Sequence, residues 1–140
     1  MADIAVVYWS GTGNTEAMAK LVAEGIKSAG KTADLISADD ADAAQVLGYS
    51  AIAFGCSSQG DEALEEDSME PLFASVEGSL SGKTVALFGS YGWGDGQWMR
   101  DWVDRTNATG ANLVGNVIAN EYPDDDAAEE CKALGAKLAA

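Results

Sequence analysis

Short apolar runs alternate along this chain with segments that have the spacing of amphipathic helices, and this alternation limits the possible folds more than any other feature. The apolar runs are Ile4–Trp9, Ala33–Ser37, Ala51–Gly55, Val85–Gly89 and Leu113–Ile118. The candidate helices are Thr15–Ala29, Asp67–Val76, Asp95–Thr109 and Asp126–Leu138, with a short additional one at Ala41–Leu47. Strands that are apolar throughout are typical of a parallel sheet covered by helices on both faces.

The predicted fold class is therefore α/β, a doubly wound three-layer sandwich around a parallel sheet with right-handed crossovers. Helix ends have suitable residues: Gly30 and Gly110 follow two helices, Asp95 is expected to cap a third, and Pro123 precedes the last. Ligands of such sheets bind at the carboxyl ends of the strands, so we expect function in the loops that follow the apolar runs.

Length and composition limit the architecture and the partners. We expect residues 1–140 to form a single domain, because 140 residues supply one ordinary core. The net charge of −15 makes nucleic acid and anionic membranes poor partners. The first apolar run is too short for a signal peptide or a membrane helix, which predicts a cytoplasmic protein, and we expect a monomer.

Several residue types narrow the chemistry. The chain has no histidine, which removes the commonest metal ligand and the usual acid/base near neutral pH. We predict no metal site and no catalytic residues. Cys56 and Cys131 form no CxxC pair, and we interpret both as reduced thiols. Trp98 and Trp102 are four residues apart on a predicted helix, which indicates core packing.

The loop after the first run reads Ser10-Gly11-Thr12-Gly13-Asn14-Thr15 and leads into a helix. Its hydroxyls, its amide and the N–H groups at the start of the helix suit one bound anion, and a phosphate monoester fits best. An ordinary capped turn is the alternative interpretation. Neither a P-loop nor a complete G-x-G-x-x-G motif is present, because no Gly-Lys-Ser/Thr follows and Glu16 occupies the last glycine position.

Two further loops follow the third and fourth runs. The second loop reads Cys56-Ser57-Ser58-Gln59-Gly60-Asp61-Glu62, and the third reads Ser90-Tyr91-Gly92-Trp93-Gly94-Asp95-Gly96. Amphipathic spacing does not account for Trp93, which lies between two glycines. An exposed indole at a strand end suits stacking on another flat ring.

Together these motifs resemble a short-chain flavodoxin over nearly the whole chain. The matching segments are Tyr8–Glu16, Gly55–Ser57 with Gly60–Glu62, and Gly89–Gly96. The resemblance implies a five-stranded sheet in the order 2-1-3-4-5, non-covalently bound FMN, and low-potential one-electron transfer between oxidised, neutral semiquinone and anionic hydroquinone states. It implies an electron-transfer protein and not an enzyme.

The resemblance also implies a role for each loop. The FMN phosphate is expected at Ser10, Gly11, Thr12, Gly13, Asn14 and Thr15, with Ser57 and bordered by Trp9. Trp93 is expected to cover the outer face of the flavin ring. The other cofactor-binding residues of its loop are expected to be Ser90, Tyr91, Gly92, Gly94 and Asp95. The loop of Ser58, Gln59, Gly60 and Asp61 is expected on the inner face, where the Gly60 peptide turns over to accept a hydrogen bond from the reduced ring. Relatives often have methionine or an aromatic residue where this chain has Gln59. The resemblance therefore leaves open how tightly the protein binds the inner face of the ring. Glu62 matches a carboxylate that bonds the ring; one more surface acid is an equally good interpretation.

The three loops contain no lysine or arginine, so the phosphate would keep its charge. Repulsion from the phosphate and from the acids at 61–67 would disfavour a second electron on the flavin. We expect redox protein partners with basic docking patches. The alternative function is a small FMN-dependent reductase acting on a soluble substrate. A receiver domain and a phosphatase are disfavoured, because Cys56 and Ser57 replace the phospho-accepting aspartate and no arginine completes an anion loop.

Overall fold

A computed structural model describes residues 2–59 and 62–140 and contains one five-stranded parallel sheet in the order β2-β1-β3-β4-β5. The strands are β1 (Ile4–Trp9), β2 (Ala33–Ser37), β3 (Ala51–Cys56), β4 (Thr84–Tyr91) and β5 (Asn112–Asn120). The helices are α1 (Asn14–Ser28), α2 (Ala43–Leu47), α3 (Met69–Val76), α4 (Gln97–Asn107) and α5 (Asp125–Ala139), with a 3₁₀ turn at Glu77–Ser79. The predicted fold class and strand order are confirmed.

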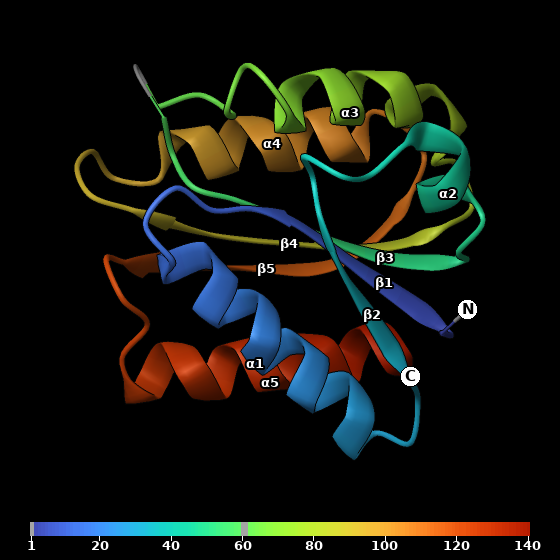
Figure 1. The fold of residues 1–140 in the computed structure, drawn as a ribbon, viewed down its shortest axis with the longest axis horizontal. Coiled ribbons are helices and arrows are strands. Elements are labelled where there is room, and N and C mark those ends of the chain that lie inside the picture. Colours follow the sequence, from blue (N-terminus) through green and yellow to red (C-terminus); the bar gives the residue numbers. More distant parts are fainter. Residues whose placement is uncertain (1, 60–61) are drawn as a thin grey trace.

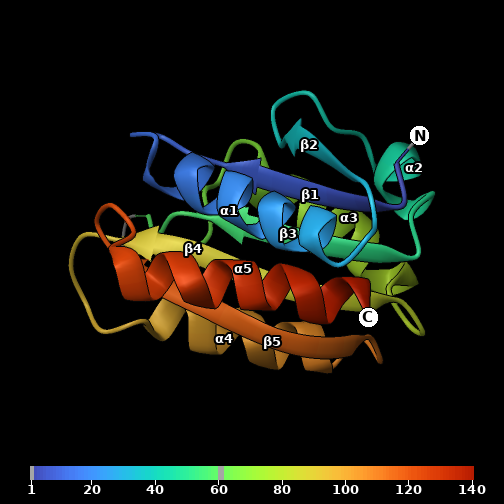
Figure 2. The same cartoon turned by 90° about the horizontal axis from the view of Figure 1, so that it is seen from below.

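Helices cover the sheet on both faces. Figure 1 shows α1 and α5 below the sheet and α2, α3 and α4 above it, and Figure 2 shows α1 and α5 side by side. Alternate residues of β1 face opposite layers, since Ile4 and Val6 pack with α1 and α5 whereas Ala5 and Val7 pack with α3 and α4. Both faces of the central strands are therefore buried, as their continuous apolar character predicts.

The α3–α4 layer contains most of the aromatic core. Phe73 makes edge contacts with Phe54 and Trp102, at 5.2 and 5.6 Å between ring centroids. Trp98 is 1 % exposed, and its indole N–H donates to the Cys56 carbonyl at 3.2 Å. The prediction that Trp98 and Trp102 belong to the core is confirmed.

Helices α3 and α4 begin, and strand β4 ends, at residues that differ from the prediction. Helix α4 starts at Gln97 with Gly96 as its N-cap residue, so the prediction that Asp95 caps it is wrong. Helix α3 starts at Met69 because the Glu65 carboxylate accepts from the N–H groups of Ser68 and Met69 at 2.8 and 2.9 Å. Strand β4 continues through Ser90 and Tyr91, the first two residues of the predicted third loop. No helix of the described segments is long and apolar enough to cross a membrane.

Candidate cofactor-binding site

The carboxyl ends of β1, β3, β4 and β5 meet around one pocket of about 150 Å³. Its lining comes from all three predicted loops and from the loop after β5. The lining residues are Gly11, Thr12, Asn14, Ser57, Ser58, Gln59, Ser90, Tyr91, Gly92 and Glu121. The pocket is therefore where a doubly wound sheet is expected to hold its ligand.

The first loop is folded around the Ser10 hydroxyl. Ser10 Oγ accepts from the N–H groups of Gly13 and Glu16 at 3.1 and 3.2 Å. Gly13, the N-cap residue of α1, has φ 94°, a left-handed conformation that favours glycine, and it has no side chain to cap the helix. Within the described residues, the N–H groups of Asn14 and Thr15 have no protein acceptor. Free N–H groups at a helix start suit an oxyanion.

The Trp9 ring packs against the backbone of this loop at Gly11. A Cβ at Gly11 would lie 2.9 Å from Cη2 of the Trp9 ring, so the indole is in contact with the loop backbone. Trp9 also packs against the α3–α4 core. Trp9 is not among the residues that line the pocket, and it is connected to the pocket only through its contact with Gly11.

Thr15 connects the three loops. Its side chain is fully buried, and its Oγ1 lies 2.7 Å from Ser57 Oγ and accepts from the Ser90 N–H at 3.2 Å. The Ser58 N–H in turn donates to the Ser90 carbonyl at 3.0 Å. The Thr15 hydroxyl thus connects the start of α1 to the ends of β3 and β4, while the Thr15 backbone N–H has no acceptor within the described residues.

The second loop turns back on itself. The N–H of Gln59 donates to the Ala63 carbonyl at 2.9 Å, and the N–H of Ala63 donates to the Gln59 carbonyl at 2.8 Å. The Gln59 side-chain amide donates to the Ser58 carbonyl at 3.0 Å. Gly60 and Asp61, including the predicted turn-over of the Gly60 peptide, lie outside the described residues.

The third loop presents Trp93 to solvent with 63 % of its surface exposed. Asp95 forms an ion pair with Arg100 at 2.8 Å, so a guanidinium from α4 lies at the outer end of this loop although the loop itself contains no basic residue. The Glu62 side chain reaches the end of this loop, where its Oε1 accepts from the N–H groups of Gly96 and Gln97 at 3.2 and 3.0 Å.

Glu121 is a pocket residue that the sequence motifs do not predict. It has φ 58°, which is unusual for a residue other than glycine. The end of β4 holds it, because its N–H donates to the Tyr91 carbonyl at 2.9 Å and its carbonyl accepts from Ser90 Oγ at 2.7 Å. The available signal was topological, since the fifth strand of a parallel sheet ends at the same edge as the others.

Both thiols are buried and inert. Burial raises the pKa of Cys56 to about 12, and its Sγ accepts from the Glu65 N–H at 3.4 Å. Burial likewise raises the pKa of Cys131 to about 12, and both cysteines are free. A thiol with so high a pKa is protonated at neutral pH and is a poor nucleophile.

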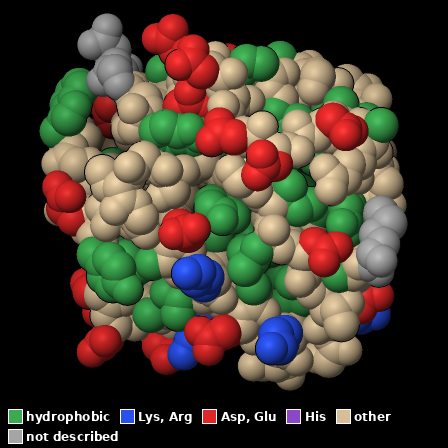
Figure 3. Space-filling view, viewed as in Figure 1, with side chains coloured by type: hydrophobic (Ala, Val, Ile, Leu, Met, Phe, Trp, Pro, Cys, Tyr) green, Lys and Arg blue, Asp and Glu red, His purple; other side chains and the backbone are tan. Residues whose placement is uncertain are grey.

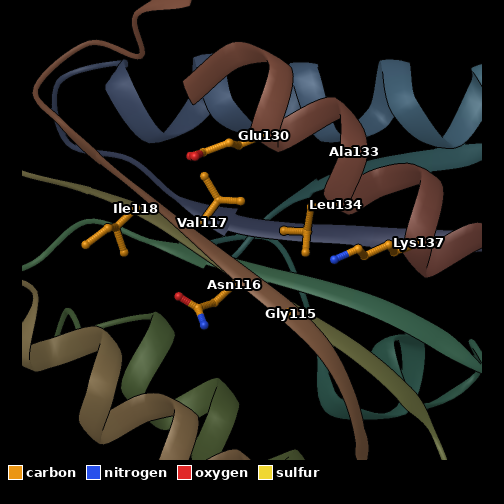
Figure 4. Close-up of a pocket in the computed structure, with 8 residues that line it drawn as sticks. All are labelled: Gly115, Asn116, Val117, Ile118, Glu130, Ala133, Leu134 and Lys137. Atoms are coloured by element: carbon orange, nitrogen blue, oxygen red, sulfur yellow. The ribbon is translucent and has the colours of Figure 1, made fainter. Parts of the chain in front are cut away.

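A larger hollow of about 370 Å³ lies elsewhere, between β5 and α5 (Figure 4). Its charged side chains, Glu130 and Lys137, project from α5 two turns apart, and the rest of its lining is mostly small or aliphatic. It is flanked by the edge strand and lies away from the three glycine-rich loops. The pocket at the strand ends is the better candidate, because polar groups converge there.

Known proteins match the chain over nearly its full length. The family model described as Flavodoxin matches residues 6–135. A flavodoxin of Clostridium beijerinckii is 46% identical, covering 96% of this chain and 97% of the relative, and one of Megasphaera elsdenii is 46% identical, covering 94% and 95%. The solution structure of two-electron reduced Megasphaera elsdenii flavodoxin superimposes with a TM-score of 0.90 at 46% identity, covering 97% of this chain and 98% of that one.

Proposed function

The chain belongs to the flavodoxin family and is an FMN-binding electron carrier, and from this premise we propose that it holds FMN in the pocket at the strand ends and transfers electrons singly at low potential. Family membership favours the carrier over the small-molecule reductase. The observation that supports the site is the convergence of the three loops on one pocket beside an exposed indole.

The residues at the pocket fit a phosphorylated flavin. The free N–H groups of Asn14 and Thr15 and the hydroxyl of Thr12 would hold the phosphate, in line with the dipole of α1. Trp93 would cover one ring face, and Gln59 and its loop would cover the other. Glu62 would accept from the ring edge through Oε2, which has no hydrogen-bond partner within residues 2–59 and 62–140.

Bound FMN supplies a ring that can take up electrons one at a time. The chain's own residues would set how easily negative charge accumulates there. Glu121 lines the pocket, Glu62 bonds to the start of α4 at the end of the third loop, and the guanidinium of Arg100 is paired with Asp95 of that loop. Coulomb repulsion by these carboxylates would raise the energy of each added negative charge, and partial exclusion of water would strengthen the repulsion. A strongly reducing second step is expected.

The partners would be redox proteins that present basic patches. The face drawn in Figure 3 carries far more acidic than basic side chains. The turn after β5 contributes Glu121 and Asp124, and the first turn of α5 contributes Asp125 and Asp126. Opposite charges would speed encounter and leave the complex weak enough for turnover.

We also infer a single domain over residues 1–140, which one sheet supports. A monomer is expected because the net charge of −15 opposes self-association. A cytoplasmic location agrees with two free buried cysteines, since reduced thiols are typical of that compartment.

Potentiometric titration of the FMN-loaded protein tests the proposal. We expect two separate one-electron steps, with the second well below the first. Titration of flavin-free protein with FMN should give tight 1:1 binding with quenching of tryptophan fluorescence. Protein that binds no FMN, or that is reduced in a single two-electron step, would contradict the proposal.

A further inference from the structure

Glu62 makes an unexpected contact across the candidate ring site. Its backbone belongs to the loop after β3, but its carboxylate caps α4, whose N-cap residue, Gly96, has no side chain. Oε1 lies 3.2 Å from the Gly96 nitrogen and 3.0 Å from the Gln97 nitrogen. The N-terminal N–H groups and the dipole of α4 favour a negative charge at this point.

The backbone of Glu62 is held in a conformation that costs energy. Its φ of 55° lies in the left-handed region, where residues other than glycine are uncommon. Such conformations persist only where the surroundings fix them. Here the backbone hydrogen bonds with Gln59 fix Ala63, the residue after Glu62, and the bonds to α4 hold the Glu62 side chain.

The turn that carries Trp93 packs against this carboxylate at Gly94. A Cβ at Gly94 would lie 2.4 Å from Glu62 Cδ, so the carboxylate packs directly on the Gly94 backbone. Gly94 also has φ 85°. The absence of a side chain at position 94 thus permits the contact that Glu62 makes with α4.

We propose that Glu62 is a positioning residue that fastens the loop after β3 to the turn carrying Trp93, so that the two walls of the ring site are fixed relative to each other before the ring binds. The proposal rests on the proposed function only in taking this space as the ring site. It differs from a hydrogen bond to the ring, because the contact with α4 is made entirely within the protein. Holding the walls in place beforehand lowers the entropy cost of ordering them on binding.

Amide hydrogen exchange in the flavin-free protein tests the contact directly. With Glu62→Ala, exchange at the Gly96 and Gln97 amides should accelerate by roughly ten- to a hundredfold, because each amide loses one hydrogen bond to a charged acceptor. Glu62→Gln keeps an acceptor oxygen and should restore most of the protection. Glu66→Ala, a neighbouring exposed acid, is the matched control. Unchanged exchange in Glu62→Ala, or equal acceleration in Glu66→Ala, would overturn the proposal.

A double-mutant cycle tests the packing on Gly94. Gly94→Ala adds both backbone strain and a clash with Glu62, whereas Gly30→Ala at φ 89° adds strain with no atom within 4 Å. Gly94→Ala should lower the folding equilibrium constant more than Gly30→Ala does. In the Glu62→Ala background the effect of Gly94→Ala should fall towards about tenfold, the effect of strain alone, because the three atoms nearest to the added Cβ are gone. If the effect of Gly94→Ala is the same in both backgrounds, the contact is absent.

Riboflavin and inorganic phosphate separate the ring from the phosphate. Glu62→Ala should weaken riboflavin binding by roughly tenfold and leave phosphate binding unchanged. Equal weakening of both would indicate general damage and reject the proposal. If the wild-type protein binds neither FMN nor riboflavin, the proposed function fails, while the exchange and the cycle still report on the contact.

Discussion

The Thr15 side chain illustrates how one buried hydroxyl can organise a site made of loops. It lies at 0 % exposure between Ser57 and the backbone of Ser90, and the Ser90 N–H has its acceptor there. Replacing the hydroxyl by a methyl group would leave that N–H buried without a partner. Burying an unpaired donor costs about 1–3 kcal/mol.

Thr15→Val should therefore lower the free energy of unfolding of the flavin-free protein by about 1–3 kcal/mol in urea titrations. Thr12→Val, at an exposed position of the same loop, is the control and should change it by less than about 0.5 kcal/mol. Equal stability of the two variants would show that the Thr15 hydroxyl does not hold the loops together.

Trp93 is expected to bind the flavin mainly through its exposed face. Trp93→Ala should raise the FMN dissociation constant by roughly tenfold, since stacking of a base on an aromatic side chain contributes about 1–3 kcal/mol. Tyr122→Ala removes an aromatic ring of similar exposure, 68 % against 63 %, from outside the pocket lining and is the control. Fluorescence titration measures both constants, and an unchanged constant for Trp93→Ala would place the stacking elsewhere.

At the scale of elements, α1 and α5 approach closely because glycines lie at their contact. A Cβ at Gly25 would lie 2.0 Å from the Lys132 carbonyl oxygen, and one at Gly135 would lie 2.1 Å from the Val22 carbonyl oxygen. Backbone oxygens cannot rotate away as side chains do. The two helices would have to separate to admit a methyl group.

Gly25→Ala and Gly135→Ala should each destabilise the fold by about 1–3 kcal/mol. The double variant should cost less than their sum, because one separation of the helices relieves both clashes. Gly78→Ala, where a Cβ meets nothing within 4 Å, should be neutral or slightly stabilising. Thermal unfolding of the four variants measures the effect, and a neutral Gly25→Ala would mean that the two helix backbones are not in contact at Gly25.

Arg105 joins α3 and the following turn to α4. Its guanidinium donates to both oxygens of Glu70, at 2.7 and 2.8 Å, and to both of Glu77, at 2.9 Å each, and it lies 5.0 Å above the Phe73 ring. The hydrogen bonds to Arg105 lower the pKa of Glu77 below its ordinary 4.5. The pair therefore stabilises the fold fully above pH 4.5, and this contribution is lost as the pH falls through the lowered pKa.

Arg105→Met should lower the free energy of unfolding at pH 7 by about 1 kcal/mol, a value reduced for the partial exposure of the pair. The difference from wild type should shrink below pH 4.5 as Glu77 becomes protonated. Arg100→Met breaks a more exposed pair on the same helix and should cost less than about 0.5 kcal/mol. A difference that is constant from pH 7 to pH 3 would exclude the ion pair as its cause.

At the scale of the whole molecule, the fold could be predicted because the central strands β1, β3 and β4 are mainly apolar and each connection between strands contains a helix. The three loops were found because glycine, hydroxyl residues and an isolated indole are local signals. Glu121 gave no such signal, since a turn reading Glu-Tyr-Pro-Asp looks like an ordinary helix start. The α4 contact of Glu62 and the pairing of Asp95 with Arg100 depend on side chains that meet only in three dimensions.

The charge of the whole molecule should govern how fast it meets partners. Electron transfer to a basic c-type cytochrome should slow as ionic strength rises, because salt screens an attraction that extends beyond the contact surface. Transfer to ferricyanide, a small anion, should accelerate under the same conditions. Stopped-flow measurements of both rate constants separate charge effects from general effects of salt, which would have the same sign for both acceptors.

Two double variants of equal net charge separate the effect of where the acidic residues lie from the effect of how many there are. Asp125→Asn with Asp126→Asn removes acids beside the strand ends, and Glu24→Gln with Asp104→Asn removes exposed acids from the middle of α1 and α4. At 0.1 M salt the first pair should reduce the rate with the cytochrome by several-fold, and the second by much less, because screening at this ionic strength limits each charge to about 10 Å. Equal reductions would mean that net charge alone steers the partner and that the acids at the strand ends do not form its docking surface.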